Sequence, residues 1–290
     1  MMADCGERLV KDWGFIDREG QALECTSDGT PLRDPARPLP RYQPLKAWHH
    51  FRELLKDKEN TAEVFNIFDA LPSKTFVPRV RKLAFSGYGS FLRETEQSLA
   101  PILDDHAALR ALPKGSVAHA YCDFMESEGL TAAGLVDESI KNGRQHFDDL
   151  IQWYGFRLRD THDLMHVLTG YGRDALGEQC VLLFTHGQNP SHGHLLLGYA
   201  GAWHISKLQE SRAPIFKAVR QAHRTGRACP PIVEMSIRDL LKMDLQEARK
   251  DLNIPDPHLY RECHRIWREE GIDPYDLLAP PERAEELKAA

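Results

Sequence analysis

The chain has 290 residues and a formal net charge of −6. Its hydrophobic content of 42% and charged content of 28% are those of an ordinary folded protein, which excludes wholesale disorder. The acidic balance argues against a nucleic-acid partner, because such a partner requires a basic surface. No apolar run reaches the ~20 residues of a spanning helix, so any contact with a membrane is expected to be peripheral.

The N-terminal segment differs from the rest of the chain. Residues 1–42 are rich in proline and turn-forming residues and lack apolar periodicity, so we expect an extended or partly disordered arm. Beyond this arm, apolar residues recur at steps of three and four, and strand-like alternation is nearly absent. The sequence therefore predicts an all-α protein with a single multi-helix domain at 43–272 and a C-terminal tail at 273–290.

Helix start and stop signals place the expected elements along the chain. Asn60 or Thr61, and Asp174, are expected N-caps. A helix is expected to begin at Ser116 and to stop at Gly129, and a joint near Gly155 is one option for the long segment 145–169. The His- and Gly-rich stretch 185–194 is expected to be a loop at the mouth of a site. The predicted helices are 45–55, 61–71, 76–88, 90–100, 116–128, 145–169, 174–185, 195–208, 212–224, 233–243, 245–252 and 257–270.

One cluster of polar residues indicates chemistry. His162 and His166 are four residues apart, so they share one face of a helix, and Asp163 lies between them. Glu178 follows after eleven further residues and is expected on the next, antiparallel helix. Two imidazoles and two carboxylates that face each other across a helix pair are typical of a divalent-metal cage.

The composition of this cage favours a catalytic ion. Nitrogen and oxygen ligands suit Zn²⁺ first, and Fe²⁺, Co²⁺ or Mn²⁺ are compatible. Four protein ligands leave a further position for water or substrate. The alternative is a chance histidine pair on a helix surface or in the core. Apolar neighbours make that alternative costly, because buried ionisable groups need a metal or a partner.

The same residues carry a family resemblance. The stretch HDLMHVLTGYGRDALGE resembles the HDxxH-x11-E signature of the ubiquinone (coenzyme Q) biosynthesis protein four family, and the similarity extends over residues 45–255. The resemblance implies an all-helical, peripheral membrane protein that binds a divalent metal through His162, Asp163, His166 and Glu178. It also implies metal-dependent oxidative decarboxylation and hydroxylation of a polyprenylated hydroxybenzoate, a lyase-type activity, together with other ubiquinone biosynthesis enzymes as partners.

Alternatives to this enzyme remain open in the sequence. A non-catalytic organiser would bind a prenylated quinone precursor and present it to partner enzymes, and a metal phosphohydrolase is a weaker option because Glu178 fits it poorly. Arg157 and Arg159 are candidates to orient the ligands or bind a substrate carboxylate, although an ordinary solvated face is the simpler expectation for them. The implied location is the cytoplasmic face of a bacterial inner membrane or the mitochondrial inner membrane, and homo-oligomerisation is left open.

Overall fold

The computed structural model describes residues 24–56, 60–134, 145–208, 210–275 and 277. Helices account for the regular secondary structure of these residues, and the only strand-like pairings there are two isolated bridges, Cys25–Pro31 and Ser116–Asp244. The all-α prediction is therefore confirmed. Among the same residues, no helix is both long enough and apolar enough to cross a membrane.

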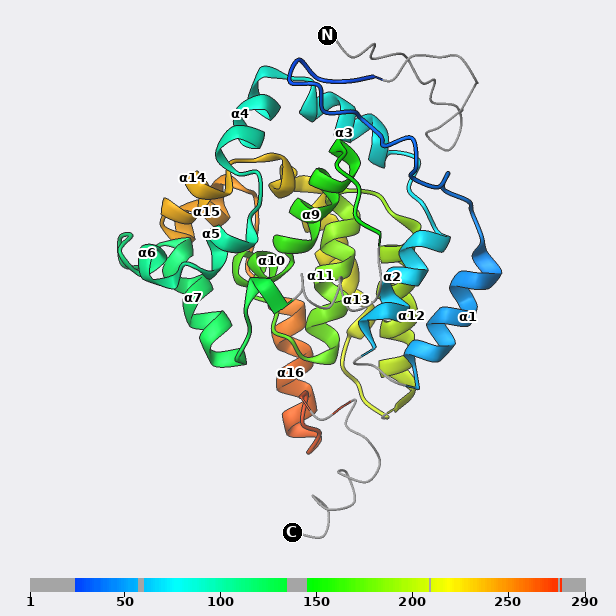
Figure 1. Cartoon of the computed structure of the whole chain (residues 1–290). Coiled ribbons are helices and arrows are strands. Elements are labelled where there is room, and N and C mark those ends of the chain that lie inside the picture. Colours follow the sequence, from blue (N-terminus) through cyan, green and yellow to red (C-terminus); the bar gives the residue numbers. More distant parts are fainter. Residues whose placement is uncertain (1–23, 57–59, 135–144, 209, 276, 278–290) are drawn as a thin grey trace. The chain divides into compact units, whose positions relative to one another are not determined.

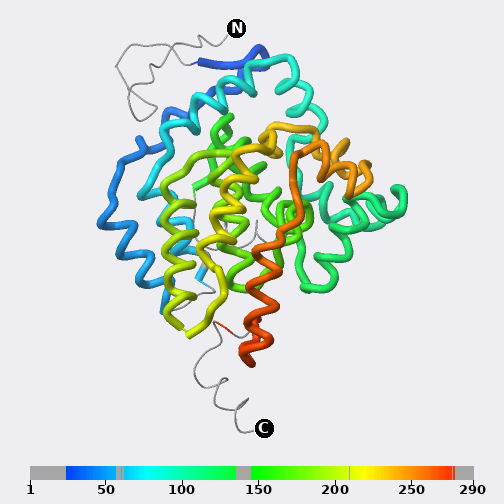
Figure 2. Tube along the Cα trace, turned by 180° about the vertical axis from the view of Figure 1, so that it is seen from behind, coloured from blue at the N-terminus to red at the C-terminus, as the bar shows by residue number. Residues whose placement is uncertain are grey.

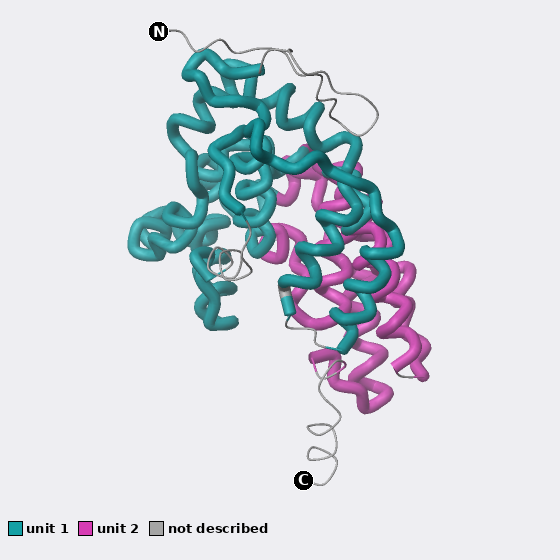
Figure 3. Tube along the Cα trace, turned by 45° about the vertical axis from the view of Figure 1, so that its right-hand side comes forward, with its two compact units in different colours: residues 1–164, 189–193, 231–248 teal, residues 165–188, 194–230, 249–290 magenta. Residues whose placement is uncertain are grey.

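Contacts between Cα atoms group the described residues into two compact units, coloured separately in Figure 3. Unit 1 takes the described residues of 1–164, 189–193 and 231–248. Unit 2 takes those of 165–188, 194–230 and 249–290. The chain passes between the units several times. The predicted domain boundaries at 42 and 272 are not tested by this division and stay predictions.

The helices of the first half of the chain, most of which are labelled in Figure 1, belong mainly to unit 1. Its buried core includes Val80, Leu92, Leu150 and Tyr154, which the helical periodicity of α3, α4 and α9 brings inward. The elements of this unit are α1 (Pro44–Leu54), α2 (Thr61–Ala70), α3 (Phe76–Ala84), α4 (Gly87–Thr95), α5 (Ala100–Asp104), α6 (His106–Arg110), α7 (Val117–Glu128), α9 (Leu150–Asp160), the 3-10 helix η1 (Ile232–Glu234) and α14 (Ile237–Lys242).

Caps set the helix ends in unit 1. The Ser116 hydroxyl accepts a hydrogen bond from the backbone N–H of His119 at 3.3 Å, and Gly129 adopts a left-handed φ of +64°, so both predicted ends of α7 are confirmed. The predicted helix 76–88 stops earlier, because Ser86 leaves the helix and caps α4 by accepting from the N–H of Gly89 at 2.9 Å.

The described part of the N-terminal arm is extended and packed within unit 1. Leu32 is 4% exposed and belongs to the buried core. Arg37 makes an ion pair with Asp149 at 2.6 Å, and the N–H of Leu150 donates to the carbonyl of Pro31 at 3.0 Å. These contacts join residues 31–37 to α9, and the extended or partly disordered arm expected at 1–42 stays a prediction. Residues 1–23 lie outside the described part of the chain.

Unit 2 is built around α11 (Ala175–Gln188), which packs along α13 (Ile215–Ala228). A Cβ atom at Gly226 would overlap the carbonyl oxygen of Phe184, and one at Gly187 would lie 2.6 Å from the carbonyl oxygen of His223, so both glycines permit the close approach. α13 also contacts α16 (His258–Glu269), and these helices run from yellow-green through yellow to orange-red in Figure 2.

Three helices belong partly to each unit. They are α10 (His162–Thr169), α12 (His192–Leu208) and α15 (Leu245–Asp251). The predicted loop at 185–194 is wrong, because α11 continues to Gln188 and α12 begins at His192. Its glycines suggested a loop, but close packing keeps Gly187 inside a helix. The predicted segment 145–169 contains two helices, as one option had it, and the break falls at Thr161 instead of Gly155.

Candidate metal centre

The predicted metal motif lies on α10. This helix is continuous from His162 to Thr169, so His162 and His166 are one turn apart on the same face. It ends where Gly170 adopts a left-handed φ of +73°, as the sequence predicted. The loop that follows turns the chain back into α11.

His166 has a defined orientation in this motif. The residue is 1% exposed, and Nδ1 lies 3.0 Å from the carbonyl oxygen of Tyr171. Because a carbonyl oxygen only accepts, Nδ1 is the donor in this contact, and Nε2 is the ring nitrogen that remains to bind a metal. Nε2 lies 3.5 Å from Oε1 of Glu178, which is longer than a hydrogen bond. A histidine that donates one ring N–H to a carbonyl and offers its other nitrogen beside a carboxylate is arranged as metal-ligating histidines are.

Glu178 is fixed by the start of α11. The Asp174 carboxylate caps this helix, and its Oδ1 accepts from the N–H groups of Leu176 at 3.1 Å and Gly177 at 3.2 Å, so the predicted cap is confirmed. Glu178 lies in the first turn after this cap, with its side chain 32% exposed. Nε of Arg173 lies 3.9 Å from Oε1 of Glu178 and adds a positive charge beside it.

Three of the four predicted ligands come together. His162, His166 and Glu178 each offer a ligand atom, and these atoms lie within 4.8 Å of one another. Asp163 is outside this group. Neighbouring residues point about 100° apart around a helix, so Asp163 leaves α10 in a different direction from His162. Asp163 is 6% exposed, and its charge is one of the causes, after burial, that raise the pKa of the Tyr121 hydroxyl. Its role as the fourth ligand stays a prediction.

A buried network holds the loop between the two ligand helices. The Tyr260 hydroxyl donates to Oδ2 of Asp174 and accepts from the N–H of Gly172 at 3.0 Å. Nε2 of His264 lies 3.1 Å from Oδ1 of Asp174, and the rings of Tyr171 and Tyr260 meet edge to face with centroids 5.3 Å apart. α16 thus contacts both the residue that caps the Glu178 helix and the residue that orients His166.

The sequence did not predict this network. Tyr260 and His264 are four residues apart on a predicted helix, which was the available signal, but nothing in the sequence connected that helix with Asp174. Burial, and then the Asp174 carboxylate, raise the pKa of the Tyr260 hydroxyl. The phenol therefore stays protonated and acts as the donor to Asp174.

The two arginines considered for ligand or substrate contacts have other partners in unit 1. Arg157 is 1% exposed and donates to the Glu96 carboxylate and to two backbone carbonyls of segment 233–235. Nε of Arg159 donates to Asp160 at 2.7 Å. The structure gives both side chains acidic partners within the unit, so neither belongs to an ordinary solvated face.

The remaining histidines of the 185–194 stretch lie on helices. His186 meets His223 edge to face with centroids 5.0 Å apart, and His192 meets Tyr42 at 5.6 Å. None of them belongs to the groups of metal-ligand atoms found among the described residues. This agrees with the preference for the α10 motif as the metal site.

Comparison with known proteins places this geometry in a family context. The family model for coenzyme Q (ubiquinone) biosynthesis protein Coq4 matches residues 93–258, more than half of the chain and including the α10 and α11 ligands. The helix α16 begins at the last residue of this match, so Tyr260 and His264 lie beyond it.

Curated relatives give the same result. The mitochondrial ubiquinone biosynthesis protein COQ4 homolog 1 of Culex quinquefasciatus is 29% identical over 159 residues, which is 52% of this chain and 52% of that protein. The mitochondrial COQ4 protein of Meyerozyma guilliermondii is 26% identical over 203 residues, 67% of this chain and 61% of that protein. The chain thus matches about half to three-fifths of the length of these relatives.

A solved structure shares the fold. It is a crystal structure of a candidate ubiquinone biosynthesis protein from Nostoc punctiforme. The superposition has a TM-score of 0.56 at 22% identity, and covers 74% of this chain and 100% of that chain. At this identity the likeness supports the helical arrangement and nothing about the chemistry.

Proposed function

Because this chain belongs to the coenzyme Q (ubiquinone) biosynthesis protein Coq4 family, we propose that it modifies a ubiquinone precursor at the metal centre on α10 and α11. The substrate we propose is a polyprenylated hydroxybenzoate. Its ring loses the carboxylate as CO₂, and the same ring carbon gains a hydroxyl group. This is a net oxidation of the ring carbon, so an oxidant of the dioxygen class is a co-substrate.

The observation that carries this proposal is the orientation of His166. Nδ1 donates to the Tyr171 carbonyl, so Nε2, which faces Glu178, is the nitrogen that can bind the ion. His162, His166 and Glu178 would hold the ion, and we propose Asp163 as a further ligand or as a charge close to the site. The N/O donor set suits Zn²⁺ first and is compatible with Fe²⁺, Co²⁺ or Mn²⁺.

The chain's own residues have separate tasks in this proposal. When bound, such an ion acts as a Lewis acid for the substrate's carboxylate and phenol oxygens. Glu178 is 32% exposed, so a ring can approach it from solvent. Arg173, 38% exposed and beside Glu178, supplies a positive charge that attracts an anionic ring. Tyr260 and Asp174 keep the Glu178 helix start in place.

One observation favours a second role, that of a lipid-binding organiser. Trp203 of α12 is 53% exposed on the apolar stretch 195–205, and exposed tryptophans are suited to a membrane interface. We therefore propose peripheral membrane association, and the mitochondrial names of the relatives support a mitochondrial site. The proposed partners are the prenylated precursor and other enzymes of ubiquinone biosynthesis.

Metal analysis combined with product analysis tests the proposal. His166→Ala and Glu178→Gln should each lose about one bound ion per chain, because each removes a ligand of the same site. The matched control is His258→Ala, which removes an exposed histidine of α16 and should keep the ion. Wild-type protein incubated with a prenylated hydroxybenzoate and oxygen should release CO₂ and yield the hydroxylated ring, detected by mass spectrometry.

The outcomes separate the two roles. Loss of product in both ligand variants, with product retained in His258→Ala, supports the catalyst. Product that forms only when partner enzymes are added, and that does not depend on the ion, supports the organiser. Full metal content in both ligand variants contradicts the metal centre.

A further inference from the structure

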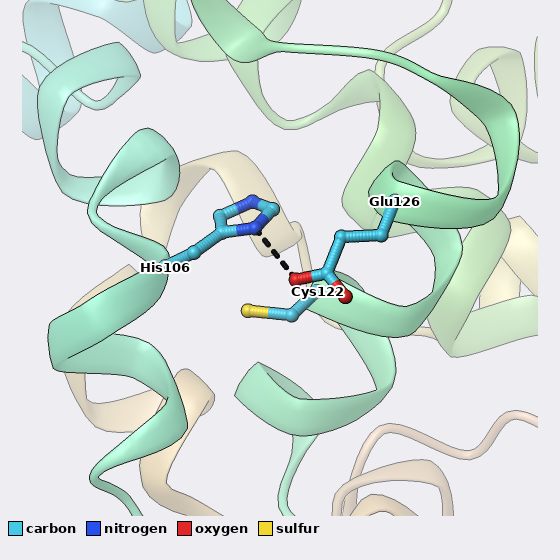
Figure 4. A group of neighbouring side chains, drawn as sticks. All are labelled: His106, Cys122 and Glu126. Carbon is cyan, nitrogen blue, oxygen red and sulfur yellow. Dashed lines mark hydrogen bonds and ion pairs between the residues drawn. The ribbon is translucent and has the colours of Figure 1, made fainter.

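A second group of ligand-type side chains lies in unit 1, on α6 and α7 (Figure 4). His106, Cys122 and Glu126 each offer one ligand atom, and these atoms lie within 4.8 Å of one another. Cys122 and Glu126 are four residues apart on α7, so helix geometry places them on one face, while His106 is the first residue of α6. None of these residues belongs to the α10–α11 motif.

Neighbouring contacts orient the Glu126 carboxylate. Its Oε1 lies 3.0 Å from Nδ1 of His106, and its Oε2 accepts from Nη2 of Arg110 at 2.7 Å. The same guanidinium also bonds Asp123 at 2.6 Å. Arg110 therefore holds one carboxylate oxygen and leaves the other directed at the imidazole. Ligating carboxylates in proteins are oriented by such outer hydrogen bonds.

The imidazole and the thiol are also placed by packing. The His106 ring meets Tyr121 edge to face, with centroids 6.4 Å apart. Cys122 is 0% exposed, as is Tyr121 beside it. A thiol sulfur, an imidazole nitrogen and a carboxylate oxygen are thus presented from two helices that contact each other.

We propose that His106, Cys122 and Glu126 form a second metal site that binds a borderline divalent cation such as Zn²⁺, with water completing the coordination. Sulfur, nitrogen and oxygen donors together match the preferences of zinc, which takes cysteine, histidine and carboxylate ligands. The cation replaces the thiol proton of Cys122, which leaves to solvent. It binds the neutral His106 ring through one nitrogen while the other ring nitrogen carries the proton. The charges of one thiolate and one carboxylate then balance the ion.

The raised pKa of the Cys122 thiol argues against a nucleophilic or redox-active role for this cysteine. Burial raises the pKa of Cys122, and the nearby carboxylates of Glu126 and Asp123 raise it further, against an opposing effect of Arg110. A nucleophilic or redox-active cysteine requires a lowered pKa. The affinity of the proposed site for the ion should rise with pH.

Cobalt binding to the full-length protein tests this site. Co²⁺ substitutes for zinc, and a thiolate ligand gives a near-ultraviolet charge-transfer band that nitrogen and oxygen ligands do not give. Metal-free wild type should develop this band on addition of Co²⁺, and so should His166→Ala, because the α10–α11 site contains no cysteine. The band should be absent in Cys122→Ser and retained in Cys229→Ser, which alters another buried free thiol.

Two variants of exposed carboxylates test the site without altering the buried Cys122, whose replacement can affect folding. Glu126 and Asp123 are both exposed, and both bond Arg110, but only Glu126 belongs to the group. Glu126→Gln should weaken Co²⁺ binding at this site at least about tenfold, and Asp123→Asn should leave it unchanged. No band in wild type, a band that survives Cys122→Ser, or equal effects of the two carboxylate variants would each overturn the site. Because the band reports sulfur ligation, none of these results bears on the α10–α11 centre.

Discussion

In two regions of the molecule a buried arginine or histidine side chain lies beside a glutamate, and the two glutamates differ in their exposure to solvent. In unit 1, Arg157 lies 3.0 Å from Glu96, and the two side chains are 1% and 0% exposed. In unit 2, His166 lies 3.5 Å from Glu178, and the histidine side chain is 0% exposed while the glutamate is 32% exposed. The first pair is closed to solvent and the second is reached from one side.

The hydrogen bonds explain the difference. Both oxygens of Glu96 accept several bonds, from the Ser236 hydroxyl at 2.8 Å and from the N–H groups of Ile237 at 3.1 Å and Arg238 at 2.9 Å. Glu96 thus caps α14 as well as balancing Arg157. A buried carboxylate whose two oxygens already accept hydrogen bonds from the protein stabilises the fold. A carboxylate at the surface end of a similar pair can serve an incoming ligand.

The largest expected effect follows from the closed pair. Glu96→Gln leaves the Arg157 charge buried without its counter-charge, and it should lower the free energy of unfolding by about 3–5 kcal/mol. Chemical denaturation followed by circular dichroism measures this change. The metal content per folded molecule should stay unchanged, because Glu96 is no part of either metal-ligand group among the described residues.

Glu262→Gln is the control for this experiment. Glu262 pairs with Arg265 on the exposed face of α16, where solvent screens the charges, so its loss should not change stability measurably. Equal stability of Glu96→Gln and wild type would break the comparison, because the buried pair would then contribute no more than a surface pair.

The next effect concerns the network that holds the metal loop. Tyr260→Phe removes the donor to the buried Asp174 carboxylate, so the free energy of unfolding should fall by about 1.5–3 kcal/mol. Metal affinity at the α10–α11 site should also fall about 10–100-fold, as expected when an outer contact of a metal site is lost. Calorimetric titration with Zn²⁺ in the His106→Gln background isolates this site from the one on α6 and α7.

Tyr88→Phe provides the matched control. The Tyr88 hydroxyl accepts from the N–H of Ser236 at 2.8 Å in unit 1, so this variant also removes a phenol that bonds the backbone. It should lose stability and keep the metal affinity of wild type. Unchanged affinity in Tyr260→Phe as well would show that the network supports the fold alone.

Local signals explain how much could be predicted from the sequence. The helix at 117–128 was predicted with both ends, because Ser116 and Gly129 act through neighbouring residues. The metal motif on α10 was also visible, since His162 and His166 are one helix turn apart. The helix that carries Glu178 could be placed because the sequence contains Asp174, which caps its first turn.

Long-range contacts explain the failures. Gly187 suggested a loop, but its close approach to α13 keeps it helical, and this partner lies far along the chain. Tyr260 and Asp174 are 86 residues apart, and Arg157 and Glu96 are 61 residues apart. Periodicity and capping carry no information over such separations. His106 was given no role for the same reason, because Cys122 and Glu126 meet it only in the folded unit.

A third pair, His186 and His223, belongs to neither metal-ligand group found in the described part of the chain, and it gives the smallest expected effect. Burial lowers the pKa of His223 from 6.5, and His186 and Arg227 lower it further. Unfolded chains therefore bind this proton near pH 6.5 while the folded protein does not, so the contribution of His223 to stability is complete above pH 6.5 and is lost as the pH falls through the lowered pKa. In His223→Gln, the unfolding temperature should decrease less as the pH is lowered than it does in wild type. The metal content should stay unchanged. His258→Gln, which alters an exposed histidine, should keep the wild-type slope. If His223→Gln instead released an ion, two facing imidazoles would suffice to bind metal here, and the exposed carboxylate would no longer be what distinguishes the α10–α11 pair.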